Sequence, residues 1–199
     1  SQSGMSDTSN PTTDTSSMAH PRQAQKKRSR PDPIEFVEIV DRSERPLLVM
    51  PRHTAQAQHL FMRSVLVVVY SPEHKLYLQH RSERKSAFPG CWDLSATGHI
   101  MPGESRFDAA TREVEEEIGL QVSQLKELLR LPASPQTNFE FVTLYSAGRT
   151  QQTPQPNPAE LQGGGFFDPD EVDCLCNQFT EYVTPALYYF WRLGVLFSK

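Results

Sequence analysis

The sequence has little cysteine, and the cysteines that it has are poorly placed for pairing. There are three in 199 residues, Cys91, Cys174 and Cys176. The number is odd, and Cys174 and Cys176 are too close together for a comfortable disulfide bond. We therefore expect free thiols in a reducing compartment, which favours a cytoplasmic location.

Long hydrophobic runs are also lacking. The longest, Val65–Tyr70 (VLVVVY), is far shorter than a membrane span and predicts a buried strand. The N-terminus lacks the charged and then apolar order of a signal peptide, and the residues before Met5 read as a cloning remnant. A formal net charge of -4 gives no field that would attract nucleic acid, and the basic run 26–30 is interpreted as solvated. We expect neither a membrane nor a nucleic-acid partner.

Two regions differ sharply in composition. Residues 1–33 are rich in Ser, Thr, Pro and Gln and offer almost nothing to bury, so they predict a disordered polar tail. Residues 34–199 have enough apolar residues for one core. The sequence therefore predicts a single folded domain after the tail.

Short apolar segments separated by turn residues predict several strands in this domain. A strand over 34–40 and a returning antiparallel segment over 45–52 are followed by further extended segments and a closing apolar helix over 184–197. The later extended segments cover residues 61–70, 76–81, 91–100, 139–147 and 164–167. The pattern is that of an α+β protein, a mixed sheet with helices packed on it.

One helix is specified in detail, from Arg106 to Ile118. Ser105 is expected to cap its start, together with Asp108, and Gly119 to end it in the left-handed conformation. Its apolar residues are spaced by three and four, which predicts one stripe facing the sheet. The expected stripe consists of Phe107, Ala110, Val114 and Ile118.

The same helix carries four glutamates within the six residues REVEEE. Glu113, Glu116 and Glu117 are related by three and four residues, so they project beside the apolar stripe. Like charges at this spacing destabilise a helix. Negative charge in the last turns also opposes the helix dipole, by about 0.3–1 kcal/mol per residue. A divalent cation such as Mg²⁺ or Mn²⁺ would relieve both the repulsion and the unfavourable dipole interaction. A solvated acidic face is the alternative.

The surrounding residues complete a known pattern. Gly98, Glu104 and the run Arg112–Leu120 resemble the Nudix box at each of its nine defined positions. The segment 78–105 is similar to the branch that contains isopentenyl-diphosphate isomerases and related hydrolases. The resemblance implies a Nudix-like α/β/α sandwich over residues 34–199, binding a small diphosphate-linked substrate.

The resemblance also implies roles for particular residues. Glu113, Glu116 and Glu117 would bind the catalytic ions with the Gly98 carbonyl, and Glu104 would pair with Arg112 to join loop and helix. A guanidinium can grip phosphate oxygens with two bonds, whereas lysine acts as a point charge. The residues expected to face the diphosphate are Arg81, Arg84, Lys85 and His99.

The catalytic base is left open by the resemblance. Glu116 or Glu117 could serve, as could Glu140, which is polar among apolar strand residues, or Glu160 in a later loop. By strand alternation, Glu140 could equally face outward.

Two departures disfavour isomerisation. Thr97 stands where the isomerases carry a catalytic cysteine, and Met62 stands near the place of a metal-binding histidine, with His59 close by. We therefore expect hydrolysis by water attack at phosphorus. The alternatives are an isomerase-like enzyme and a catalytically silent binding module.

Three further features have two interpretations each. Trp92 is expected in the core or stacked on a substrate, and Gly163–Gly165 either permits close backbone approach or forms a flexible bend. Trp191 and Phe197 are expected to pack the last helix or to form a homodimer contact.

Overall fold

The computed structural model describes residues 33–197. The described residues from Ile34 onward form one compact unit, and the tail predicted for 1–33 lies outside the described residues apart from Pro33. No helix in the described part of the chain is long and apolar enough to span a bilayer. All three cysteines are free, as predicted, while the cytoplasmic location stays a prediction.

A mixed sheet forms the centre of the molecule, and its middle strand is β3 (Met62–Tyr70). Within the described residues this sheet has seven strands, β3 included. Five follow the order β5-β4-β3-β8-β7, while β6 pairs with β3 and β9 pairs with β4. Among the described strand pairs of this sheet, β3 and β8 run parallel and the others run antiparallel. The other bounds are β4 Leu76–Arg81, β5 Trp92–Asp93, β6 Ala96–His99, β7 Lys126–Leu131, β8 Glu140–Arg149 and β9 Leu161–Phe167.

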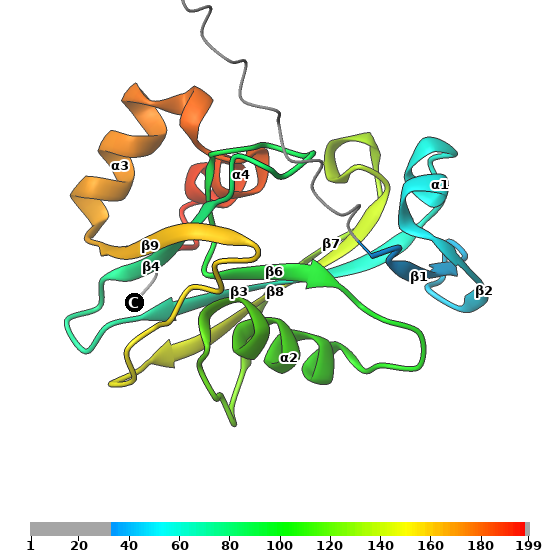
Figure 1. Ribbon diagram of the computed structural model, residues 1–199, viewed down its shortest axis with the longest axis horizontal. Helices are drawn as coiled ribbons and strands as arrows, with labels where there is room; N and C mark the ends of the chain where they lie inside the picture. Colours follow the sequence, from blue (N-terminus) through cyan, green and yellow to red (C-terminus); the bar gives the residue numbers. More distant parts are fainter. Residues whose placement is uncertain (1–32, 198–199) are drawn as a thin grey trace, which may run out of the picture. The chain divides into compact units, whose positions relative to one another are not determined.

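Helices cover both faces of this sheet (Figure 1). Because side chains alternate along β3, Val65, Val67 and Val69 pack against α2 (Arg106–Ile118) on one face. Leu66 and Val68 pack on the other face, against α3 (Pro169–Gln178) and α4 (Pro185–Leu193). The predicted α+β class is confirmed, with helix layers on both sides of a mixed sheet.

A separate two-stranded sheet precedes the main one. β1 (Phe36–Val40) and β2 (Pro46–Pro51) pair antiparallel, as the sequence predicts. Val37 and Ile39 of β1 bury themselves with Met62, at the start of β3. The hairpin therefore packs at the edge of the domain where β3 and β8 begin.

The ends of α2 follow the predicted capping chemistry. The Ser105 hydroxyl accepts the Asp108 N–H at 3.0 Å, and Gly119 ends α2 with a φ of +66°. Asp168 caps α3 and forms a reciprocal capping box with Glu171. The Ser105 and Gly119 signals thus fix where α2, the helix that carries the clustered glutamates, begins and ends.

Some predictions for elements were incomplete or wrong. The helix α1 (Arg52–Ala57), the strand β7 and the short 3-10 helices η1 (Pro135–Thr137) and η2 (Thr180–Tyr182) were not foreseen. The closing helix ends at Leu193, because Gly194 is left-handed. Phe107 was wrongly placed in the apolar stripe: it is 43% exposed, since the sheet covers α2 only from Ala109 onward.

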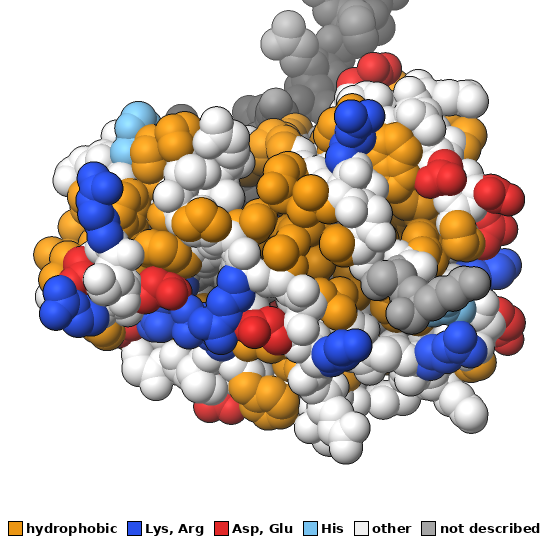
Figure 2. Space-filling view, turned by 180° about the vertical axis from the view of Figure 1, so that it is seen from behind, with side chains coloured by type: hydrophobic (Ala, Val, Ile, Leu, Met, Phe, Trp, Pro, Cys, Tyr) orange, Lys and Arg blue, Asp and Glu red, His pale blue; other side chains and the backbone are white. Residues whose placement is uncertain are grey.

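Several large hydrophobic side chains remain exposed, among them Leu47 and Val49 of β2. From behind, hydrophobic side chains gather across the middle of the face between scattered charges (Figure 2).

The two residues considered for a homodimer contact lie against the domain's own core. Trp191 packs at the edge of the core and donates its indole N–H to Asp173 at 2.7 Å, and Phe197 contacts the Tyr70 ring. The homodimer therefore stays a prediction.

The glycine run 163–165 lies within β9, paired with β4. A Cβ on Gly164 would overlap the Tyr77 hydroxyl and come within 2.9 Å of the Leu78 carbonyl oxygen. No atom lies within 4 Å of a Cβ placed on Gly163. The close approach at Gly164 is therefore to a buried tyrosine on the neighbouring strand.

We expect Gly164→Ala to destabilise the protein by about 1–3 kcal/mol, because the rigid Tyr77 ring and a backbone oxygen have to move. Urea unfolding followed by circular dichroism measures the change. Gly163→Ala is the matched control and should unfold close to wild type. Equal stability of the two variants would contradict this interpretation.

Candidate active site

The site lies where β6 passes the middle of α2. Val65 of β3 pairs with Gly98 of β6, which brings the glycine against the helix. A Cβ on Gly98 would overlap the Glu113 carboxyl group. Only glycine therefore leaves Glu113 in this place, with its carboxylate against the Gly98 backbone.

Glu117 is the most deeply placed of the three clustered glutamates, with 4% of its surface exposed. One carboxylate oxygen accepts the Thr97 N–H at 2.6 Å and the other accepts from the Gln79 amide at 3.3 Å. Burial, followed by the charge of Glu113, raises the pKa of Glu117 well above its ordinary value. Its position is fixed by two strands, β6 and β4.

Glu113 and Glu116 differ from Glu117 in exposure and in partner. Arg112 bonds both, at 2.7 Å to Glu113 and 3.1 Å to Glu116. Burial raises the pKa of Glu113 to about 7, with the charges of Glu116 and Glu160 adding to the rise and Arg112 opposing it. The Glu116 side chain is 58% exposed. The three acids thus range from fully buried to open to solvent.

Arg112 ties the loop before α2 to the helix. Its guanidinium forms two bonds with the Glu104 carboxylate, at 2.7 and 3.0 Å, and donates to the His99 carbonyl at 3.1 Å. Glu104 also accepts the Met101 N–H at 3.0 Å. Burial opposes ionisation of Glu104, but these bonds hold its pKa below the usual value. The structure brings the predicted pair together.

His99 is held between two carboxylates rather than left free. Its Nε2 bonds Glu140 of β8, and its Nδ1 lies 3.6 Å from Glu35, before β1. Burial alone would lower the pKa of His99, but the bonds to Glu140 and Glu35 raise it to about 9. The imidazole is therefore positively charged near neutral pH. Glu35 carried no signal in the sequence, because only the tertiary fold brings it here.

The strand position paired with Glu140 is Met62, which is completely buried. The nearby His59 does not reach Glu140, because the His59 ring stacks on Phe139 at a centroid distance of 4.5 Å. Of the two histidines, it is His99 that bonds Glu140.

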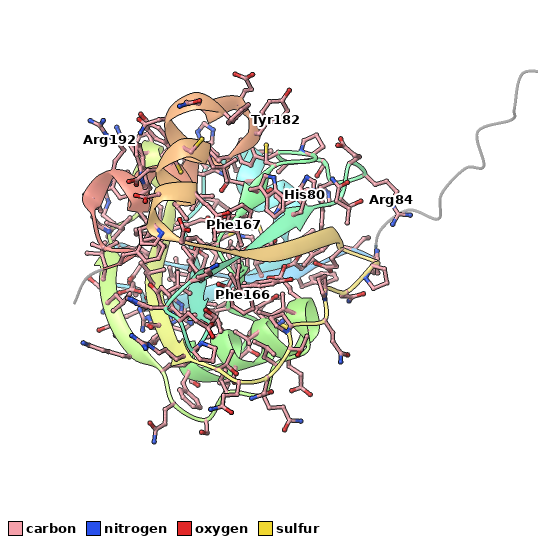
Figure 3. The ribbon with its side chains drawn as sticks, turned by 90° about the vertical axis from the view of Figure 1, so that its left-hand side faces the viewer. His80, Arg84, Phe166, Phe167, Tyr182 and Arg192 are labelled. Atoms are coloured by element: carbon pink, nitrogen blue, oxygen red, sulfur yellow. The ribbon has the colours of Figure 1, made fainter. Side chains whose placement is uncertain are left out.

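The predicted diphosphate-binding residues separate into different roles. Arg81 donates twice to the Ala87 carbonyl, at 2.8 and 3.2 Å, so it shapes the loop after β4. Lys85 pairs with Glu160 at 3.2 Å. Arg84 is exposed and projects outward from the same loop (Figure 3). Arg84 is therefore the most available of the three cations.

A loop from β8 to β9 closes the acidic end of α2. The N–H groups of Gln155 and Asn157 each donate at 2.8 Å, to the carbonyls of Ile118 and Glu117. The loop ends at Glu160, whose charge raises the pKa of both Glu113 and Glu117. Glu160 is therefore close enough to belong to the site.

The aromatic residue Trp92 lies on the opposite face of the sheet. It stacks on His80 at 4.3 Å and meets the edge of Phe167, which projects toward α3, while Phe166 projects to the α2 side (Figure 3). Trp92 is partly buried against the core, which agrees with the core interpretation.

The donor chemistry of the acidic cluster fits a divalent cation. Burial is the main cause of the raised pKa values of Glu113 and Glu117, and neighbouring carboxylates add to the rise. Hard oxygen ligands of this kind suit Mg²⁺ or Mn²⁺. Within residues 33–197, no three His, Cys, Asp or Glu side chains are already arranged to hold an ion. Binding therefore requires side chains to turn, and Glu116 is the most exposed of the three.

Comparison with known proteins identifies the family. The model of the NUDIX domain matches residues 60–187. An uncharacterized Nudix hydrolase of Streptomyces coelicolor is 35% identical, over 80% of this chain and 88% of its own length. An isopentenyl-diphosphate Delta-isomerase of Pectobacterium atrosepticum is 30% identical, over 70% of this chain and 80% of its own.

Solved structures agree on the fold. A Deinococcus radiodurans crystal structure superposes with a TM-score of 0.69 at 23% identity, covering 80% of this chain and 98% of that one. A MutT structure, from a study of the Aliivibrio salmonicida and Vibrio cholerae proteins, gives a TM-score of 0.52 at 20% identity. It covers 68% of this chain and 97% of the other. These likenesses confirm the predicted sandwich architecture.

We expect Gly98→Ala to fold but to bind divalent metal about tenfold more weakly, because the new methyl group displaces the Glu113 carboxylate. A Mn²⁺ titration followed by electron paramagnetic resonance measures the affinity. Gly163→Ala serves again as a control with wild-type affinity. Unchanged metal affinity in Gly98→Ala would contradict the expectation.

His99 makes stability depend on pH. Its folded-state pKa is raised from 6.5 to about 9, so its contribution is complete below pH 6.5 and is lost as the pH rises through about 9. We expect His99→Asn to flatten the decline of unfolding free energy across this range. Urea unfolding at a series of pH values measures it. His59→Asn should keep the wild-type slope, and a wild-type slope in His99→Asn would contradict the assignment.

Proposed function

The chain belongs to the Nudix hydrolase family, whose activity is pyrophosphate-type hydrolysis, and we propose that it hydrolyses a diphosphate-linked small molecule with the help of Mg²⁺ or Mn²⁺. The substrate is a nucleoside diphosphate derivative or a similar compound. The observation that carries the proposal is the packing of the Glu113 carboxylate against Gly98, beside buried Glu117. Residues 34–199 make up the catalytic domain.

Four groups would hold the ion: the carboxylates of Glu113, Glu116 and Glu117, and the carbonyl oxygen of Gly98. The ion supplies positive charge against the diphosphate and makes water more acidic. When Glu113 and Glu116 turn toward the ion, the bonds of Arg112 to Glu104 and to the His99 carbonyl would keep the guanidinium in place.

Glu116 is the base that this arrangement favours. Its side chain is 58% exposed and can meet water, whereas both oxygens of Glu117 accept bonds from fixed donors. The water adds to one phosphorus as the bridging anhydride bond breaks, and Glu116 takes the proton. Glu140 is less suited, because His99 binds it. Glu160 is the remaining candidate, since it lies near the cluster and, among residues 33–197, forms its ion pair with Lys85 alone.

The substrate phosphates would meet the loop after β4. Arg84 is exposed there, and Lys85 can exchange Glu160 for a phosphate oxygen. Arg81 and His99 act indirectly, through the loop carbonyl and through Glu140. Positive charge at the loop would stabilise the leaving phosphate.

Isomerisation of a prenyl diphosphate is the second candidate, because relatives named isopentenyl-diphosphate Delta-isomerase match this chain. Thr97 opposes it. A hydroxyl does not replace the acid–base chemistry of a thiol, and the Thr97 N–H is already used to hold Glu117. Hydrolysis needs no group at this position.

The experiment is release of phosphate or pyrophosphate from nucleoside di- and triphosphates, nucleotide sugars, dinucleotides, CoA and prenyl diphosphates, with Mg²⁺, Mn²⁺ or chelator. We expect metal-dependent turnover that falls about a hundredfold to ten-thousandfold in Glu116→Gln. Glu115→Gln is the matched control, because Glu115 is exposed on the same helix outside the cluster.

Equal loss in Glu115→Gln would show that helix charge, not the cluster, governs activity. Turnover that survives chelation would contradict the metal. Conversion of isopentenyl diphosphate to its isomer, without phosphate release, would favour the second candidate.

A further inference from the structure

Gln79 of β4 is a polar side chain in a fully buried place. None of its surface is exposed, and its amide nitrogen donates to the Ser95 carbonyl at 3.2 Å and to Glu117 at 3.3 Å. Ser95 in turn bonds the Tyr77 carbonyl at 2.6 Å through its hydroxyl. A small polar layer therefore lies under the acidic end of α2.

Stability alone does not account for this amide. Its carbonyl oxygen is buried and finds no hydrogen-bond partner among the described residues. The amide does not improve by turning over, since its nitrogen faces two acceptors, the Ser95 carbonyl and the Glu117 carboxylate. A buried acceptor without a donor is destabilising, so the amide is not the side chain that this place would take for its carbonyl oxygen alone. A sequence that keeps such a group has a reason outside local stability.

The contact with Glu117 supplies that reason. The Thr97 N–H on β6 holds one carboxylate oxygen and the Gln79 amide on β4 holds the other. A carboxylate has about four lone-pair sites, so each oxygen keeps capacity for a further partner. The two donors fix the plane of the carboxylate while leaving it able to bind a cation.

We propose that Gln79 is a positioning residue that holds Glu117 in the orientation needed to bind the divalent ion. The inference rests on the proposed function, because it assigns Glu117 to that ion. Glu117 is the fixed ligand, oriented from behind by the sheet, and Glu116 is the exposed one. Gln79 touches neither substrate nor ion.

The test separates stability from metal binding. Gln79→Met keeps about the same volume and removes the unpaired oxygen, together with the donor to the Ser95 carbonyl and to Glu117. We expect the metal-free variant to remain folded, with a modestly lower urea midpoint, because two buried acceptors lose this donor. We also expect its Mn²⁺ affinity, measured by electron paramagnetic resonance, to fall about tenfold. Gln79→Leu is the second variant and should behave in the same way.

Ser95→Ala is the matched control in the same layer. Its hydroxyl accepts the Val69 N–H and bonds the Tyr77 carbonyl, but only its backbone carbonyl meets Gln79. We expect it to lower the urea midpoint and to keep wild-type Mn²⁺ affinity. In a Glu117→Gln background, Gln79→Met should change the affinity far less, because the group that it orients has lost its charge.

Each remaining outcome overturns the proposal. Wild-type Mn²⁺ affinity in a folded Gln79→Met or Gln79→Leu means that Glu117 needs no such donor, and the proposed function is untouched. Loss of folding in both variants means that the amide is a structural requirement. Absence of Mn²⁺ binding in wild type, together with absence of turnover, defeats the proposed function and this inference with it.

Discussion

The Arg112 guanidinium is the group on which the site depends. It bonds Glu104 in the loop, the His99 carbonyl on β6, and Glu113 and Glu116 on its own helix. A planar cation with several donors can satisfy acceptors in different directions, which an ammonium group on a flexible stem does less well. Without it, Glu113 and Glu116 would lose their positive partner, and the loop that carries Glu104 would lose its anchor on the helix.

The acidic end of α2 combines two unfavourable terms, like charges and a helix C-terminus. The surrounding chain offsets them with backbone donors. Gln155 and Asn157 satisfy the last helical carbonyls, and Thr97 satisfies Glu117. These donors come from loops and strands far from α2 in sequence, so the helix is stable here because of its tertiary setting. This explains how two carboxyls with raised pKa values can persist side by side.

Local signals predicted what local physics decides. The bounds of α2, its Ser105 cap and its Gly119 end follow from neighbouring residues, and the strand runs follow from apolar patterning. The sequence did not reveal β7 or α1, whose residues lack a clear period, nor the exposure of Phe107. In the site, the Glu104–Arg112 pair was foreseeable from a known pattern. Glu35 beside His99 and the loop role of Arg81 were not, because they depend on which distant segments the fold brings together.

His99 shows how neighbouring residues set the charge of a largely buried side chain. Met62, which stands near the place of a histidine in the isomerase pattern, is apolar and completely buried. The His99 imidazole lies between Glu35 and Glu140, and these two carboxylates raise its pKa, so that it is a cation between two anions. Glu35 and Glu140 are thus compensated by the His99 cation itself. Glu113 and Glu116, which the proposed function assigns to the ion, instead share the single guanidinium of Arg112.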